Sequence, residues 1–109
     1  MLAADYLGRA QALMLERGKE YDKPEGERSM LRTIRAFNAI TGHNLTEAEG
    51  WLLMQVLKDV RQWQNPGRFH QDSAEDGIAY SALKAEALDS MQTFPHDSLQ
   101  DRIQRQEQA

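Results

Sequence analysis

Apolar residues recur along this chain at the three- and four-residue spacing of an amphipathic α-helix, and no segment shows the period of two typical of a half-buried strand. The pattern predicts four helices, over about residues 2–17, 29–41, 46–64 and 72–91. Four helices with short connections are typical of a bundle. We therefore predict an all-α fold, a four-to-five-helix bundle in which residues 98–109 could add a short polar helix.

Three of the predicted helix ends carry clear local signals. Gly18 stands where a left-handed residue commonly ends a helix, here the first one, and Gly42 stops the second. Thr46 followed by Glu49 forms a capping box, in which the hydroxyl and the carboxylate each accept a backbone N–H of the first turn. The other expected N-caps are Ser29 for the second helix and Asp72 or Ser73 for the fourth.

The predicted helices differ in the width of their apolar faces. The third helix is apolar around most of its circumference, which predicts a central helix contacted on several sides. Its apolar residues are Trp51, Leu52, Leu53, Met54, Val56, Leu57, Val60 and Trp63. The fourth helix has a narrow face suited to close packing, made of Ile78, Ala79, Ala82, Leu83 and Ala85. The second helix is expected to bury Met30, Ile34, Phe37 and Thr41.

The length of 109 residues, with 40% apolar residues, fits a single domain with a modest core. We expect residues 1–92 to form the bundle and residues 93–109 to form a polar tail or short helix. Small helical chains often finish burying their apolar faces by self-association. A homodimer or higher homo-oligomer is therefore expected.

The charge balance and the missing cysteines narrow the function classes. The chain has 13 Lys and Arg against 17 Asp and Glu, whereas nonspecific nucleic-acid binders carry a basic excess, so nucleic acid is not the expected partner. Without cysteine there is no disulfide or thiolate–metal site. No stretch reaches the roughly 18–20 apolar residues of a membrane span, and the N-terminus lacks a signal-peptide pattern. A cytoplasmic location is expected.

Three acidic residues near the start of the fourth helix are candidate metal ligands. Asp72 and Asp76 are four residues apart, so a helix places both carboxylates on one face, where they can share a hard cation such as Mg²⁺. Glu75 lies between them. The alternative is helix capping, because acids in a first turn complement the positive end of the helix dipole. The two interpretations are compatible.

Two cations and a charged connector are candidate ligand-binding elements. Lys58 and Arg61, three residues apart near the end of the third helix, form a small cationic face able to bind phosphate. They could equally form a solvated face. The connector 18–28, which contains Tyr21, could cover a ligand or be an ordinary polar loop. The histidines, His43, His70 and His96, fall in separate loops, so no zinc site is predicted, although His70 lies close to Asp72.

Parts of residues 15–88 resemble a known group of proteins. The segments from Arg17 to Tyr21 and from Lys58 to Arg61, and Asp72-x-x-x-Asp76 followed by Ile78-Ala79-Tyr80, resemble a family of small bacteriophage and prophage proteins of unassigned function. That family is similar to the MazG-like all-α NTP pyrophosphatases. The resemblance implies a MazG-like helical core that forms dimers or tetramers. It also implies a Mg²⁺ ion that activates water as a nucleoside triphosphate loses pyrophosphate.

The resemblance carries over to only part of the metal motif. Asp76 matches the aspartate of the Glu-x-x-Asp motif, but Ser73 stands where that motif has glutamate. On the preceding helix, the region of the Glu-x-x-Glu pair contains Gln55 and Lys58 instead. Asp72 or Glu75 would have to supply the missing carboxylate.

Two functional hypotheses follow. The first is a Mg²⁺-dependent nucleotide pyrophosphohydrolase with Asp72 and Asp76 as catalytic residues. In it Asp72, Asp76 and Glu75 hold the metal, and the residues that contact the nucleotide are Lys58, Arg61, Arg17 and Tyr21. The second is a noncatalytic phage accessory protein that sequesters a nucleotide signal or binds a host protein. A purely structural assembly factor is a third alternative.

Overall fold

The computed structural model describes residues 1–20 and 29–92, and in these ranges it is all-helical, without strands. Its four helices are α1 (Ala3–Glu20), α2 (Met30–Thr41), α3 (Glu47–Trp63) and α4 (Gln71–Gln92). The predicted all-α class and the four helices are therefore confirmed. The connector with Tyr21 and the tail at 93–109 lie outside the described residues.

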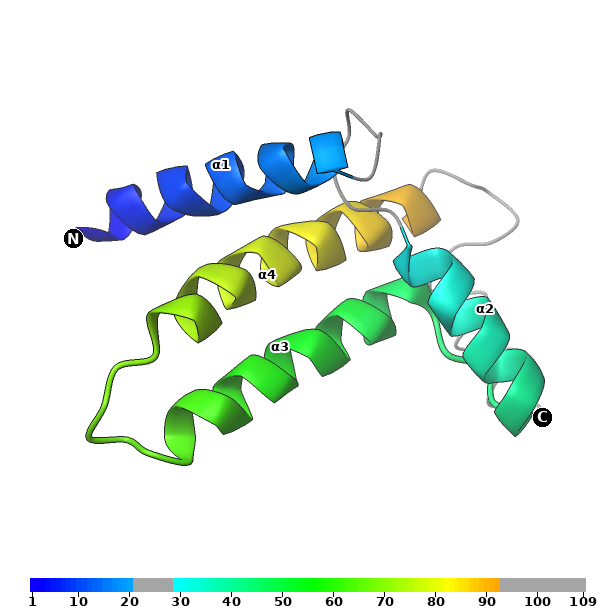
Figure 1. The fold of residues 1–109 in the computed structure, drawn as a ribbon. Helices are drawn as coiled ribbons and strands as arrows, with labels where there is room; N and C mark the ends of the chain where they lie inside the picture. The colour runs from blue at the N-terminus through cyan, green and yellow to red at the C-terminus, as the bar shows by residue number, and fades with distance from the viewer. Residues whose placement is uncertain (21–28, 93–109) are drawn as a thin grey trace.

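Three helices lie side by side in one layer, with α4 between α1 and α3 (Figure 1). The short connection between α3 and α4 makes these two helices antiparallel, and their contact is the most extensive in the fold. The remaining helix, α2, is inclined against the N-terminal end of α3. This arrangement makes α4 the central helix of the layer and leaves α3 at one edge.

The helix ends predicted at Gly42 and Thr46 are confirmed, whereas the end predicted at Gly18 is wrong, because α1 continues through Gly18 to Glu20. Gly42 follows α2 with φ of 76°, and its N–H donates to the Asn38 carbonyl oxygen at 2.9 Å. In the capping box of α3, Thr46 Oγ1 accepts the Glu49 N–H at 3.1 Å, and Glu49 Oε1 accepts the Thr46 N–H at 2.9 Å. These residues fix the turn between α2 and α3.

The expected caps of the other two helices are confirmed only in part. Ser29 is the N-cap residue of α2, as predicted, but its side chain makes no capping hydrogen bond. Helix α4 begins at Gln71, so Asp72 and Ser73 are inside its first turn. The imidazole of His70 takes the capping role, since its Nδ1 accepts the Ser73 N–H at 3.2 Å and lies 2.6 Å from Ser73 Oγ. A ring nitrogen thus supplies the acceptor expected from the Asp72 carboxylate or the Ser73 hydroxyl.

The core lies between α3 and α4. Trp51 is only 2% exposed and stacks on Tyr80, with ring centroids 5.6 Å apart and planes inclined by 23°. The buried cluster comprises Ala48, Trp51, Leu83 and Ala87. The small-residue face of α4 is confirmed at Ala79 and Leu83, which are buried, whereas Ala82 and Ala85 are exposed.

Helix α2 packs on α3 through a glycine. A Cβ at Gly50 would lie 2.6 Å from Met30 Sδ and 2.9 Å from Ile34 Cδ1, so any other residue there would force these side chains to shift. Ile34 is buried and Met30 half-buried, as predicted, but Phe37 and Thr41 are exposed. The buried side of α2 is narrower than its sequence suggested, because only one end of the helix meets α3.

The prediction that α3 is covered on several sides is wrong for the single chain. Trp51 is buried, but six other apolar residues of this helix are exposed, namely Leu52, Leu53, Val56, Leu57, Val60 and Trp63. The reason is its position at the edge of the layer, where it packs on α4 and α2 alone among the described elements.

We expect Thr46→Ala to lower the free energy of unfolding by about 1 kcal/mol, because the first turn of α3 loses its side-chain acceptor. Urea denaturation followed by circular dichroism measures the change. Thr33→Ala, at an exposed position of α2 where the hydroxyl donates to the Ser29 carbonyl oxygen just before the helix, is the matched control. Equal effects of the two substitutions would show that the capping box does not stabilise α3.

Candidate functional site

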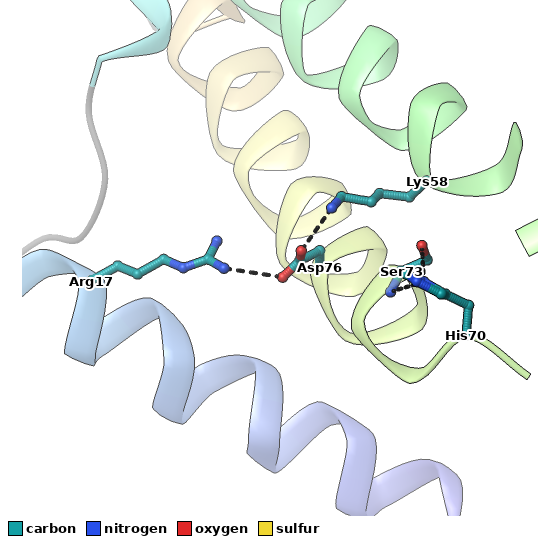
Figure 2. A network of polar contacts seen from close by, with 5 residues as sticks. All are labelled: Arg17, Lys58, His70, Ser73 and Asp76. Atoms are coloured by element: carbon teal, nitrogen blue, oxygen red, sulfur yellow. Dashed lines mark hydrogen bonds and ion pairs between the residues drawn. The ribbon is translucent and has the colours of Figure 1, made fainter. Parts of the chain in front are cut away.

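One carboxylate, on Asp76 of α4, lies between cations from two other helices (Figure 2). Lys58 Nζ of α3 lies 2.9 Å from Asp76 Oδ2, and Arg17 Nη2 of α1 donates to Asp76 Oδ1 at 3.2 Å. The Lys58 and Asp76 side chains are 10% and 13% exposed, and that of Arg17 is 40% exposed. We call these three residues the Asp76 cluster.

Helical spacing explains how the sequence brings the cluster together. Lys58 stands two turns after Trp51, so it shares the face of α3 that packs on α4. Asp76 precedes the buried Ala79 and Leu83 at the same face of α4. Both polar residues are thus directed inward by the apolar residues in register with them.

A small pocket adjoins the cluster between α1, α3 and α4. Its volume is about 50 Å³, enough for a few water molecules at roughly 10–15 Å³ each. Its lining combines Arg17 and Asp76 with the stacked Trp51 and Tyr80, and with Leu13, Met14, Ala79 and Leu83. The pocket therefore places a cation and an aromatic pair beside each other on mostly apolar walls.

Glu75 binds different partners from its sequence neighbour Asp76. Its Oε1 accepts hydrogen bonds from Gln71 Nε2 at 2.8 Å and from Arg9 Nε of α1. The hydrogen bond from Gln71, followed by that from Arg9, lowers the pKa of Glu75 below its ordinary value of 4.5. This side chain is nearly buried and forms a second link between α1 and α4.

The structure joins some of the predicted site residues and separates others. Lys58, Asp76 and Arg17 are in one cluster. Arg61 and Asp72 are exposed and make no ion pair within the part of the chain that the structure describes. The expected Lys58–Arg61 pair is thus replaced by Lys58 and Arg17, from two different helices.

The carboxylates predicted to hold Mg²⁺ do not converge. Residues 1–20 and 29–92 contain no group of three or more His, Asp or Glu side chains that could hold a metal ion. Asp76 and Glu75 each have basic partners, and the Lys58 ammonium lies against the oxygen that a metal would need. The residues as arranged do not fit a preformed magnesium site, and the magnesium requirement remains a prediction.

Sequence reasoning missed the Arg9–Glu75 pair and the capping role of His70. Arg9 and Glu75 are 66 positions apart, so no local spacing indicates their contact. His70 was noted only for its closeness to Asp72. An acceptor side chain immediately before the first helical residue is the signal that could have identified it as a cap.

Comparison of the chain with protein-family models, curated proteins and solved structures finds no match. None of the helices in the described ranges combines the length and apolar character needed to cross a membrane.

The Lys58–Asp76 pair can be tested by a double-mutant cycle. Asp76→Asn should lower the free energy of unfolding by about 2 kcal/mol, less than the roughly 3–5 kcal/mol for a fully buried pair, because both groups keep some contact with water. Lys58→Met should cost less, since Arg17 still compensates Asp76. Urea denaturation should show a double variant less destabilised than the sum of the two. Additive losses would contradict a direct interaction.

The lowered pKa of Glu75 predicts a contribution to acid destabilisation. The native state keeps this carboxylate charged to lower pH than the unfolded state does, so the contribution is complete above about pH 5.5 and is lost as the pH falls through the lowered pKa. Glu75→Gln and Gln71→Ala should both reduce the loss of unfolding free energy between pH 6 and 3. Curves parallel to that of the wild type would contradict this origin.

Proposed function

We propose that this chain binds a phosphorylated nucleotide at the Asp76 cluster, and that it holds the nucleotide without a metal-dependent reaction. The observation that carries the proposal is the convergence of Lys58 and Arg17 on one carboxylate beside a pocket with a stacked aromatic pair. The sequence resemblance to nucleotide-processing proteins supports the same ligand class.

The charge of the cluster favours an anion. Two cations and one carboxylate leave a net charge of +1 beside mostly apolar walls, where Coulomb interactions are stronger than in bulk water. An ammonium group has three N–H donors and a guanidinium has five. Each cation therefore has the capacity to bind a phosphate oxygen in addition to Asp76.

Arg17 is the side chain best able to exchange partners. It is 40% exposed, and its guanidinium suits bidentate recognition of phosphate. A phosphate group carries more charge than Asp76 and would compete for Arg17, while the less exposed Lys58 remains beside the carboxylate. Arg17 would then be the first contact of the incoming ligand and Lys58 the inner one.

The size of the pocket indicates how a nucleotide would lie. At about 50 Å³ it cannot enclose a base and a sugar. A terminal phosphate would enter beside Arg17, which lines the pocket, with Lys58 on the other oxygen of Asp76, and the rest of the nucleotide would extend toward the surface. In this pose phosphate contacts supply most of the affinity.

The arrangement of carboxylates favours binding over hydrolysis. Asp76 already has two cationic partners, Glu75 binds Arg9 and Gln71, and Asp72 is exposed. Mg²⁺-dependent pyrophosphohydrolysis would require Asp76 to exchange Lys58 for the metal and to gain a further carboxylate. Hydrolysis is therefore the second candidate, and the experiment below separates it from binding.

Isothermal titration calorimetry with ATP, inorganic pyrophosphate and adenosine, each in EDTA, tests the proposal. ATP and pyrophosphate should bind and adenosine should not. Arg17→Gln and Lys58→Met should each weaken ATP binding about tenfold or more, because a charge-assisted hydrogen bond contributes roughly 1.5–3 kcal/mol. Arg35→Gln and Lys84→Met are the matched controls and should leave the affinity unchanged.

Asp76→Asn distinguishes the two candidate functions. In EDTA it should strengthen ATP binding, since it removes the negative charge that competes with phosphate. If Asp76 instead holds Mg²⁺, the same substitution would abolish a Mg²⁺-stimulated release of pyrophosphate from nucleoside triphosphates. Such turnover, or absence of ATP binding by the wild type, would overturn the proposal.

A further inference from the structure

The largest group of exposed apolar side chains on one helix lies on α3, in the part of the chain that the structure describes. It comprises Leu52, Leu53, Val56, Leu57, Val60 and Trp63. Trp63 is the most exposed of the six, at 71%. At 100° per residue these six positions cover one side of the helix, opposite the side that carries Trp51 and Lys58. We call this group the outer face of α3.

The spacing within the outer face is that of a helix–helix seam. Leu53, Val56, Val60 and Trp63 follow one another at intervals of three, four and three residues, with Leu52 and Leu57 beside them. Apolar residues at these intervals pack into the holes of a second helix that runs nearly parallel or antiparallel. Helix α3 lies at the edge of the layer, so such a helix can reach it (Figure 1).

We propose that a second copy of this chain covers the outer face, with α3 of the two copies packed antiparallel about a two-fold axis near Val56 and Leu57. The six side chains expose roughly 600 Å² per copy, taking about 150–250 Å² for each complete side chain. A standard stable interface buries about 800 Å² per partner. The outer face therefore supplies most of the area of a stable dimer, and the polar residues that flank it would have to supply the rest.

The charges at the two ends of α3 favour the antiparallel orientation. The exposed Glu49 is in its first turn, the exposed Arg61 is in its last turn, and the exposed Arg68 follows in the next loop. Antiparallel pairing places the acidic end of each helix beside the basic end of its counterpart and opposes the helix dipoles favourably. Parallel pairing would bring like charges together at both ends.

The proposed interface and the Asp76 cluster are on opposite sides of α3. Lys58 faces α4, whereas Val56 and Val60 face outward. Substitutions in the outer face should therefore leave ATP binding intact. An experiment that disproves the dimer would therefore leave the nucleotide-site proposal standing, and the reverse also holds.

Sedimentation velocity of the full chain tests the dimer. The wild type should sediment as a dimer, and Val60→Glu as a monomer with unchanged helical circular dichroism, since a charge placed in the seam must be desolvated. Ile40→Glu, at a position of α2 that is 84% exposed, is the matched control and should remain dimeric. A monomeric wild type, or a Val60→Glu variant that stays dimeric, would overturn the proposal.

Single cysteines test the orientation, because the chain has no cysteine of its own. Under mild oxidation Val56→Cys should form a disulfide with its counterpart, since the two lie close to the axis and within the about 7 Å Cα separation that a disulfide allows. Trp63→Cys should not, because antiparallel pairing separates the two copies by roughly 18 Å along the helices. Cross-linking at both positions would indicate a parallel dimer, and cross-linking at neither would exclude this seam.

Discussion

The carboxylate of Asp76 is the point at which three of the four described helices are joined by charge. Helices α1 and α3 each pack on α4, and the ion pairs from Arg17 and Lys58 tie both of them to the same side chain. Apolar packing contributes less here than in a larger domain. Of the seven buried apolar residues in the described ranges, four are alanines, which have little surface to remove from water. The ion pairs to Asp76 therefore add to the apolar packing that positions α1 and α3 on α4.

The same charges connect stability with the proposed function. In the proposed binding mode, a phosphate group would compete with Asp76 for Arg17, so that ligand binding would exchange an intramolecular ion pair for an intermolecular one. The link between Arg9 and Glu75 does not take part in this exchange, and it would keep α1 attached to α4 while Arg17 changes partner. Under this proposal the ligand would replace the Arg17–Asp76 link between α1 and α4 and leave the Arg9–Glu75 link in place.

Local sequence signals predicted the helices well, because capping residues and apolar periodicity act within a few positions. Gly42 and the Thr46–Glu49 box set their helix ends as expected. Contacts between distant segments were predicted in part. The pyrophosphohydrolase hypothesis grouped Lys58, Arg17 and Asp76 in one site, and the structure joins these three side chains. The hypothesis also paired Lys58 with Arg61, which is exposed, since the partner of an inward lysine depends on which helices lie next to each other. The sequence correctly showed that α3 is apolar around most of its circumference. The inference that these residues are buried was wrong for the single chain, where much of that surface is exposed.

The most direct test of the central claim is side-chain ¹⁵N NMR of the Lys58 ammonium and the Arg17 guanidinium while ATP is added in EDTA, with the signals assigned from Lys58→Met and Arg17→Gln. If the Asp76 cluster is the phosphate site, both signals shift together and saturate at one ATP per chain, while the Lys84 signal stays in place. Unchanged Lys58 and Arg17 signals at saturating ATP would contradict the account.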